Sequence, residues 1–282
     1  MSMMTTVNKN KHLFGAIIGD IVGSVYEFSR QKSYDFEFFS YGCNITDDTI
    51  LTCATAEAIL RNGNIVDTQD FANEYYDFAK EFPRPMGGYG AGFSTWVFDG
   101  TMRPYNSLGN GAPMRVSPCA YFSAYINRCL EVATMSASAT HNHWQAIRAV
   151  QCVTFAIYEL RHGTSVEDLI QKIYQQYEYG MIRLCTKDQK AYDLFQQKYE
   201  YTEHSEKTVI GALICALSAT SFEDAIRRAV SLGGDADTLA AIAGSIAEAR
   251  FEIPDAMIDV AKQKLPKKLL DIVTEFNETI AL

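Results

Sequence analysis

The chain of 282 residues is 48% hydrophobic and 21% charged, and it contains 18 glycines and 7 prolines. This composition is typical of a well-packed globular protein and excludes a disordered, collagen-like or low-complexity chain. An excess of 34 acidic over 25 basic residues gives a net charge of −9, which argues against nucleic-acid binding, because that binding needs a broad basic surface. A nucleotide-sized ligand is not excluded, since one or two arginines or a helix N-terminus can hold a diphosphate.

Cysteine usage and hydropathy indicate a reducing, cytoplasmic setting. The seven cysteines are odd in number and form no CxxC pair, so neither a zinc site nor a disulfide framework is predicted. The apolar run from Leu13 to Val25 is interrupted by Asp20 and is followed by no small-residue cleavage site, so we do not predict a signal peptide. No stretch is apolar enough over about 18 residues to cross a membrane.

Apolar residues recur at helical spacing along almost the whole chain, most clearly over 142–162, a segment closed by Gly163. Predicted helices cover 12–28, 47–62, 68–81, 117–135, 142–162, 166–177, 188–200, 206–219, 222–231, 237–250, 255–263 and 267–280. No segment alternates in the manner of a strand, so we expect an all-α fold. The connections are short and contain no linker, so we expect one domain over 1–282, with 1–11 as a disordered tail.

Two short acidic motifs precede apolar helices. Thr46-Asp47-Asp48-Thr49 stands before the helix at 47–62, and Gly233-Gly234-Asp235-Ala236-Asp237-Thr238 stands before the helix at 237–250. Helix capping explains each motif alone. It does not explain four aspartates at the ends of two buried helices, which would repel one another and lose hydration. We therefore expect a nearby cation. Oxygen ligands without His or Cys select Mg²⁺, Ca²⁺ or Mn²⁺, and two ions sharing an aspartate remain open.

Other motifs permit two interpretations. Asp20 and Glu27 are seven residues apart, which would place them on one helix face, either as functional carboxylates or as helix-end residues paired with Lys or Arg. The glycine-rich stretch 107–115 could bring backbone N–H groups to a phosphate or be a plain connection. Gly88-Tyr89-Gly90 is a tight turn by default. His141-Asn142-His143 opens the helix at 142–162, and we interpret it as a cap rather than a nuclease motif.

The segments GDIVGSVYEF, TDDT, GYGAGF, GNGAPMRVSP, HNHWQAI and SLGGDADTLAAIAG, in this order, resemble the ADP-ribosylglycohydrolase family. The resemblance implies an all-α orthogonal multi-helix bundle with a binuclear Mg²⁺ or Mn²⁺ centre. It implies as metal ligands Thr46, Asp47, Asp48, Asp235, Asp237 and Thr238. It implies as catalytic carboxylates Glu27, Asp48 and Asp237, with Glu27 lying over the metal centre.

The resemblance also implies how a substrate would lie. Ser107, Gly109, Asn110 and Gly111 would hold a diphosphate, His141 would lie against an adenosine, and Gly88, Tyr89 and Gly90 would border a distal ribose. Trp144 stands where many relatives have Pro, and a position in the core or beside adenine is open.

The implied reaction is hydrolysis at C1″ of the distal ribose, which releases ADP-ribose from a modified protein, with an arginine linkage favoured. The alternatives are an inactive ADP-ribose-binding relative and a hydrolase of serine-linked ADP-ribose or of a free ADP-ribose derivative. We expect a monomer whose partner is an ADP-ribosylated protein or an ADP-ribose-containing small molecule.

Overall fold

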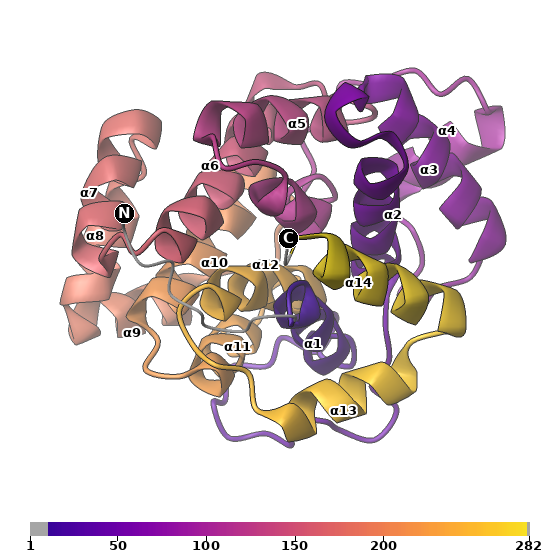
Figure 1. The fold of residues 1–282 in the computed structure, drawn as a ribbon. Coiled ribbons are helices and arrows are strands. Elements are labelled where there is room, and N and C mark those ends of the chain that lie inside the picture. The colour runs from indigo at the N-terminus through magenta and orange to yellow at the C-terminus, as the bar shows by residue number, and fades with distance from the viewer. Residues whose placement is uncertain (1–10, 281–282) are drawn as a thin grey trace.

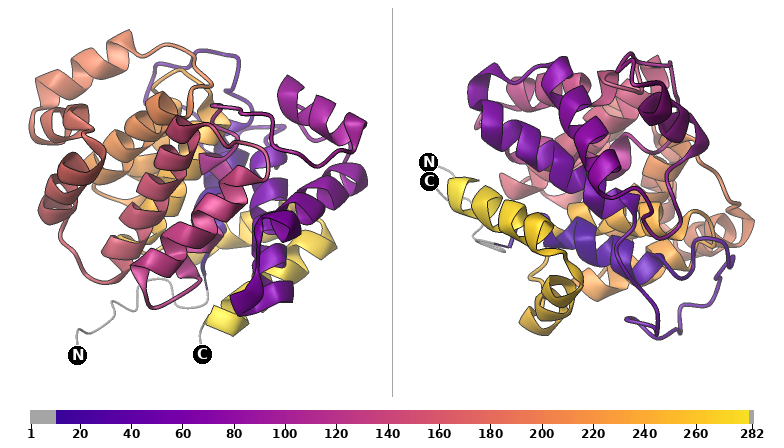
Figure 2. Two further views of the ribbon diagram at one scale, coloured as in Figure 1. Left: turned by 90° about the horizontal axis from the view of Figure 1, so that it is seen from above. Right: turned by 90° about the vertical axis from the view of Figure 1, so that its right-hand side faces the viewer.

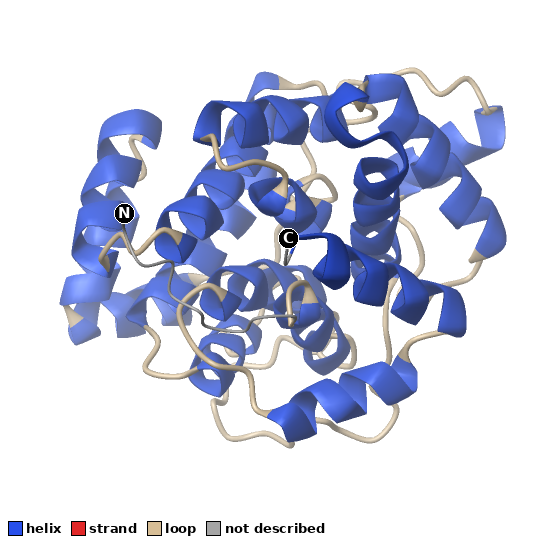
Figure 3. Ribbon diagram, viewed as in Figure 1, coloured by secondary structure: helices blue, strands red, loops and turns tan. Residues whose placement is uncertain are grey.

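The computed structural model describes residues 11–280. Over this range the chain folds into α-helices and three short 3₁₀ helices, and its only β-type contacts are two isolated bridges, so helices and loops alone are seen (Figure 3). The predicted all-α class is confirmed. The tail expected over 1–11 lies outside the described residues except for Lys11.

The α-helices of the described range are α1 (Phe14–Gly23), α2 (Asp47–Asn62), α3 (Thr68–Glu81), α4 (Ala91–Asp99), α5 (Ile126–Ser138), α6 (Trp144–Arg161), α7 (Val166–Tyr177), α8 (Gly180–Lys187), α9 (Gln189–Lys198), α10 (Ser205–Ser218), α11 (Phe222–Val230), α12 (Ala236–Glu248), α13 (Asp255–Lys264) and α14 (Lys267–Ile280). The 3₁₀ helices are η1 (Gly63–Ile65), η2 (Pro113–Arg115) and η3 (Ser117–Tyr121).

Two predicted helices are shorter than expected. The helix predicted over 12–28 ends at Gly23, because Ser24 Oγ donates to Ile21 O and Tyr26 N–H donates to Gly23 O, which replaces the helical pattern with tight turns. The helix predicted over 117–135 is split into η3 and α5, and Tyr125 before α5 has an extended backbone. Helices α4 and α8 were not predicted.

The centre of the molecule is the antiparallel pair of α1 and α12, the most extensive helix contact in the described chain (Figure 1). Gly15, Gly19 and Gly23 share one face of α1 because they are four residues apart. A Cβ on Gly19 would lie 2.0 Å from Ala240 O, and a Cβ on Gly23 would lie 2.4 Å from Ala236 O. The two backbones are therefore in contact, and the end of α1 that follows Asp20 lies beside the start of α12.

The remaining helices surround this pair (Figures 1 and 2). α2 packs against α1, α3 and α14, while α10 and α11 pack against α12. α3 and α4 lie at one edge of the molecule and α7, α8 and α9 lie at the opposite edge. All seven cysteines are buried and free. No helix within 11–280 is long and apolar enough to cross a membrane.

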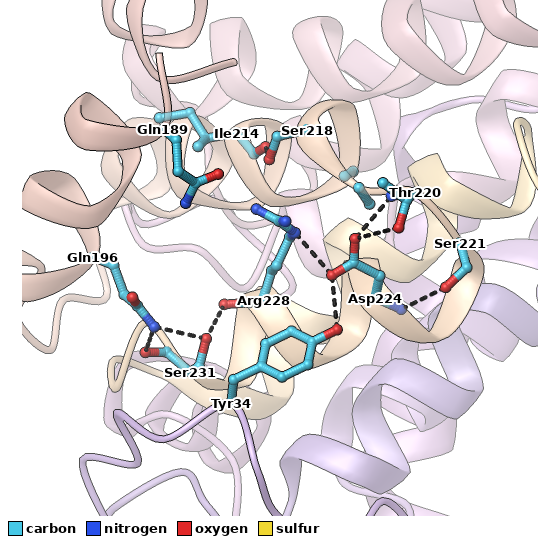
Figure 4. Close-up of polar contacts among 12 residues, drawn as sticks. Tyr34, Gln189, Gln196, Ile214, Ser218, Thr220, Ser221, Asp224, Arg228 and Ser231 are labelled. Carbon is cyan, nitrogen blue, oxygen red and sulfur yellow. Dashed lines mark hydrogen bonds and ion pairs between the residues drawn. The ribbon is translucent and has the colours of Figure 1, made fainter. Parts of the chain in front are cut away.

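The irregular segment between α1 and α2 is fastened to α11 by one carboxylate. Asp224 accepts from Tyr34 Oη at 2.8 Å, from Arg228 Nε at 2.8 Å and from Thr220 N at 2.8 Å (Figure 4). Lys32 of the same segment donates to Tyr199 O at 2.7 Å. These bonds give the segment that carries Glu27 a defined course without secondary structure of its own.

Candidate functional site

The N-termini of α2 and α12 meet at one place in the structure. Thr46 caps α2, since its Oγ1 accepts from Asp48 N at 3.2 Å. Thr238 Oγ1, in the first turn of α12, donates to Asp48 Oδ2 at 3.3 Å and so joins the two helices. Asp235 precedes α12 without capping it, and its Oδ2 accepts instead from Asn110 Nδ2 at 2.7 Å. Capping therefore accounts for the first motif only in part and for the second not at all.

Asp20 holds the first motif in place. Its carboxylate is fully buried and accepts from Thr46 Oγ1 at 2.7 Å, from Thr46 N at 3.0 Å and from Thr49 N at 3.1 Å. Glu27 does not share a helix face with Asp20, contrary to the prediction, because α1 ends at Gly23. It lies on the following turn, with Oε2 2.7 Å from where a Cβ on Gly87 would stand.

Six carboxylates gather here without a basic partner. Two groups of three have oxygens within 4.8 Å of one another, and Asp237 belongs to both: Asp20, Asp48 and Asp237, and Glu27, Asp235 and Asp237. Asp47 is half-buried and lines the same cleft. None of the six forms an ion pair with a Lys, Arg or His of residues 11–280. The alternative that Asp20 and Glu27 are ion-paired helix ends is thus not seen.

Burial and mutual repulsion disfavour the ionised forms. Burial raises the pKa of Asp20 to about 6. Burial, and then the charges of Asp235, Asp20 and Glu203, raise the pKa of Glu27 to about 7. The pKa values of Asp48 and Asp237 are well above the ordinary range, first through burial and then through neighbouring carboxylates. A bound cation would remove this penalty.

The residues present fit a hard cation. Every donor is an oxygen of a carboxylate or a threonine hydroxyl, the set that Mg²⁺, Mn²⁺ and Ca²⁺ prefer. Asp48 Oδ1 is buried and has no hydrogen-bond partner, which leaves a full acceptor free. Such an orphan is costly unless a ligand satisfies it.

The glycine-rich loop lines the same cleft. Ser107 Oγ accepts from Gly109 N at 3.1 Å, Asn110 N donates to Glu203 O at 2.7 Å, and Ser205 N donates to Leu108 O at 3.0 Å. The loop is therefore held against the segment that precedes α10. A Cβ on Gly111 would lie 3.4 Å from His141 Nε2, so the missing side chains leave this face of the imidazole open.

Only some of the other predicted site residues line the cleft. Gly88 and Gly90 line the cleft, whereas Tyr89 is outside its wall and donates its hydroxyl to Phe82 O at 2.9 Å. Trp144 is neither in the core nor in the cleft; it is 60% exposed and stacks on His143. His143 caps α6 by accepting from Gln145 N, which confirms the cap interpretation for this residue.

The sequence analysis gave no site role to four polar side chains that line the cleft, namely Tyr105, Arg115, Tyr201 and Glu203. The side chain of Arg115 is only 1% exposed, and its guanidinium lies 3.8 Å from the centre of the Tyr75 ring. No carboxylate of the described chain forms an ion pair with it. The position of Arg115 at the end of the glycine-rich stretch 107–115 is the local signal for it. Glu203 and Tyr201 reach the cleft through tertiary contacts and have no local signal.

Fold and site together define an all-helical protein whose cleft combines a carboxylate cluster with a glycine-rich loop. The family model for ADP-ribosylglycohydrolase matches residues 11–279. The chain belongs to the ADP-ribosylglycohydrolase family, which is a family of glycosidase-type hydrolases.

Curated relatives are similar over most of their length. ADP-ribosylarginine hydrolase Tri1 of Pseudomonas putida is 25% identical over 300 residues, covering 96% of this chain and 80% of the relative. ADP-ribosylhydrolase ARH3 of Mus musculus is 26% identical, covering 86% and 84%. ADP-ribosyl-[dinitrogen reductase] glycohydrolase of Rhodospirillum rubrum is 25% identical, again covering 86% and 84%.

A solved structure, described as an ADP-ribosylglycohydrolase-related protein complex, matches with a TM-score of 0.70 and 22% identity and covers 98% of both chains. This likeness supports the fold.

Proposed function

We propose that the chain is a Mg²⁺-dependent hydrolase that releases ADP-ribose from a mono-ADP-ribosylated protein, with arginine as the favoured linkage. The observation that carries the proposal is that one cleft brings together the carboxylate cluster and the glycine-rich loop. The cluster lines the cleft with Glu27, Asp47, Asp48, Asp235 and Asp237, and the same lining includes the loop and Arg115. A ligand that joins a polyhydroxylated ribose to a diphosphate would match these two kinds of lining.

The proposed metal ligands are the threonines and aspartates of the two motifs, namely Thr46, Asp47, Asp48, Asp235, Asp237 and Thr238. Two bound Mg²⁺ ions, or Mn²⁺ in their place, would supply Lewis acidity at the distal ribose. Asp20 is added here as a positioning residue, since it holds both the backbone and the hydroxyl of Thr46. Asn110 has the corresponding role for Asp235.

Glu27 is the proposed proton-transfer group, with Asp48 and Asp237 as the other catalytic carboxylates. One of its carboxylate oxygens lies within 4.8 Å of oxygens of Asp235 and Asp237, so it stands beside the proposed metal ligands, where a carboxylate can transfer a proton as the bond at C1″ breaks. Gly87 and Gly88 have positive φ angles of 76° and 86°. This turn lets Glu27 approach the backbone closely and leaves room for the distal ribose beside Gly88 and Gly90.

Binding energy from the rest of the ligand would position C1″. Ser107, Gly109, Asn110 and Gly111 are the proposed diphosphate loop, and His141 borders the adenosine. Tyr89 would contribute its backbone only, since its hydroxyl is engaged by Phe82 O.

Linkage preference rests on resemblance to the arginine hydrolase relative, so the decisive test compares linkages. The protein is incubated with arginine-linked and serine-linked ADP-ribosyl peptides and with O-acetyl-ADP-ribose, each with Mg²⁺ or with EDTA. We expect Mg²⁺-dependent release, fastest from arginine. Faster release from serine or from the small molecule would favour the alternative substrate. Binding of ADP-ribose without any release would favour the inactive relative.

We further propose a monomeric protein of the cytoplasm. Seven free, buried thiols support a reducing compartment. Sedimentation velocity tests the first part, and the redox state of the thiols in cell extracts tests the second.

A further inference from the structure

A buried relay leads from Arg115 to the glycine-rich loop. Arg115 Nη2 donates to Thr140 Oγ1 at 2.6 Å, and Thr140 Oγ1 lies 2.7 Å from Nδ1 of the adjacent His141. All three side chains are buried, with exposed fractions of 1%, 0% and 4%. The far nitrogen of His141, Nε2, has no hydrogen-bond partner within the described residues and faces Gly109 and Gly111.

The hydrogen-bond inventory of Thr140 fixes the direction of this relay. A guanidinium can only donate, so Thr140 Oγ1 is the acceptor of its bond with Arg115. The single hydroxyl proton of Thr140 must then go elsewhere, and His141 Nδ1 is the one acceptor that Oγ1 contacts in the described chain. Nδ1 must therefore be unprotonated, because otherwise a buried hydroxyl would be left without an acceptor.

The imidazole has only one other place for its proton. A neutral imidazole without a proton on Nδ1 carries it on Nε2. Burial lowers the pKa of His141 well below its ordinary value, and the charge of Arg115 lowers it further. The ring is thus neutral near pH 7 and presents a single N–H to the cleft.

We propose that Arg115 and Thr140 are positioning residues that fix His141 as the Nε2–H tautomer, so that this N–H is donated to a diphosphate oxygen of the ligand. The proposal rests on the proposed function for the identity of the ligand. Absent side chains at Gly109 and Gly111 bring the phosphate near Nε2, because a Cβ there would stand 3.6 Å and 3.4 Å from that nitrogen. In this arrangement the contact would lie where the diphosphate joins the adenosine, so His141 would border both groups.

The N–H that His141 offers to the phosphate is an uncharged donor whose place on the ring is fixed by Thr140. A phosphate oxygen only accepts, so the opposite tautomer would set a lone pair against a lone pair. The relay excludes that tautomer without a carboxylate partner for the imidazole. A buried carboxylate on Nδ1 would add another negative charge to a cleft that must accept an anion.

Two measurements on the full-length chain test the proposal. In the first, ADP and adenosine are titrated into wild type, Thr140→Val and Thr140→Ser. Valine has the shape of threonine without its hydroxyl, and serine keeps the hydroxyl. We expect about tenfold weaker binding of ADP by Thr140→Val, unchanged binding of adenosine, and recovery in Thr140→Ser. Equal loss for ADP and adenosine would overturn the proposal, since a merely structural role affects both.

The second measurement reads the tautomer directly and does not need Thr140→Val to fold. Long-range ¹H–¹⁵N spectra of the metal-free protein should show Nδ1 of His141 unprotonated and Nε2 protonated at pH 7, with His141→Gln identifying the resonances among the five histidines. A protonated Nδ1 overturns the relay. His141→Gln, whose amide reaches the Nε2 position, should bind ADP better than His141→Asn, and the reverse order overturns the donor role.

The results that would contradict the proposed function differ from those that would contradict the relay alone. If wild type binds neither ADP nor ADP-ribose and releases nothing from the linkage panel, both the proposed function and the diphosphate contact are wrong. Mg²⁺-dependent release together with a protonated Nδ1 would overturn only the relay.

Discussion

The contact between α1 and α12 predicts the effect of adding one methyl group. In Gly19→Ala the new Cβ would stand 2.0 Å from Ala240 O and 2.7 Å from Ala241 N, whereas ordinary contact begins at 3.4 Å. Both neighbours are backbone atoms, so the helices must part by more than about 1 Å. Asp20 and Asp237, which come from these two helices, would move apart with them.

The expected magnitude follows from two opposed effects. Replacing Gly by Ala within a helix stabilises it by about 1 kcal/mol. Overpacking a well-packed core costs about 1–3 kcal/mol and occasionally more, and a clash with rigid backbone belongs at the upper end. We expect Gly19→Ala to lower the free energy of unfolding by about 2 kcal/mol and to weaken Mg²⁺ binding at least tenfold.

The assay is urea denaturation in EDTA, together with calorimetric titration of Mg²⁺. Gly180→Ala is the matched control, because a Cβ there would meet only the Tyr174 ring at 3.6 Å; its stability should stay within about 0.5 kcal/mol of wild type. If Gly19→Ala unfolds at the wild-type urea midpoint and binds Mg²⁺ as tightly, the close contact between the helices does not position the carboxylates, and the reasoning is refuted.

Three further predictions concern the cleft. Gly109→Val should weaken ADP-ribose binding while the melting temperature changes little, because its side chain would fill the space before His141; unchanged affinity in a titration would make the loop a plain connection. Glu27→Gln should retain most ADP-ribose binding but slow release from the arginine-linked peptide more than tenfold, a loss of over about 1.4 kcal/mol of transition-state stabilisation; an unaltered turnover number would exclude a role in proton transfer. The metal-free protein should lose stability as pH rises from about 4 to about 7. The folded pKa values of Asp20, about 6, and of Glu27, about 7, exceed the unfolded values near 4. The folded state therefore binds more protons than the unfolded state in this pH window, and raising the pH favours unfolding. Saturating Mg²⁺ should reduce that loss of stability in thermal melts. The part of the loss that comes from Glu248, whose pKa is also about 7, should remain. A metal-free melting temperature that does not change with pH would contradict the argument that burial and repulsion destabilise the ionised carboxylates.

The spacing of apolar residues was sufficient to predict most of the helices. The segment over 142–162 has its apolar residues at helical spacing and became α6 with His143 as its cap. α8 was missed because Gly180–Lys187 has only eight residues and little room to show a period. The predicted end of α1 was wrong because apolar residues continue past Gly23, while the side chain of Ser24, which takes up the Ile21 carbonyl, leaves no mark in a hydropathy pattern.

The carboxylate cluster was predictable where one motif carries its own chemistry. The aspartates at 47, 48, 235 and 237 stand out because charges precede apolar helices. The role of Asp20 could not be predicted in this way, since its partners Thr46 and Thr49 are more than 25 residues away and the spacing to Glu27 suggested a different partner. Glu203 likewise reaches the cleft through the pairing of its backbone with Asn110, a contact that only the folded chain reveals.

The most direct test of the central claim is ADP-ribose release from an arginine-linked peptide at saturating Mg²⁺, compared between wild type and Asp237→Ala. Asp237 belongs to both groups of carboxylates, so its loss should reduce Mg²⁺ affinity and release together, with wild type fast and the variant slowed far more than tenfold. Equal background release by both proteins would contradict the proposal that this cleft is an arginine-directed ADP-ribosylhydrolase site.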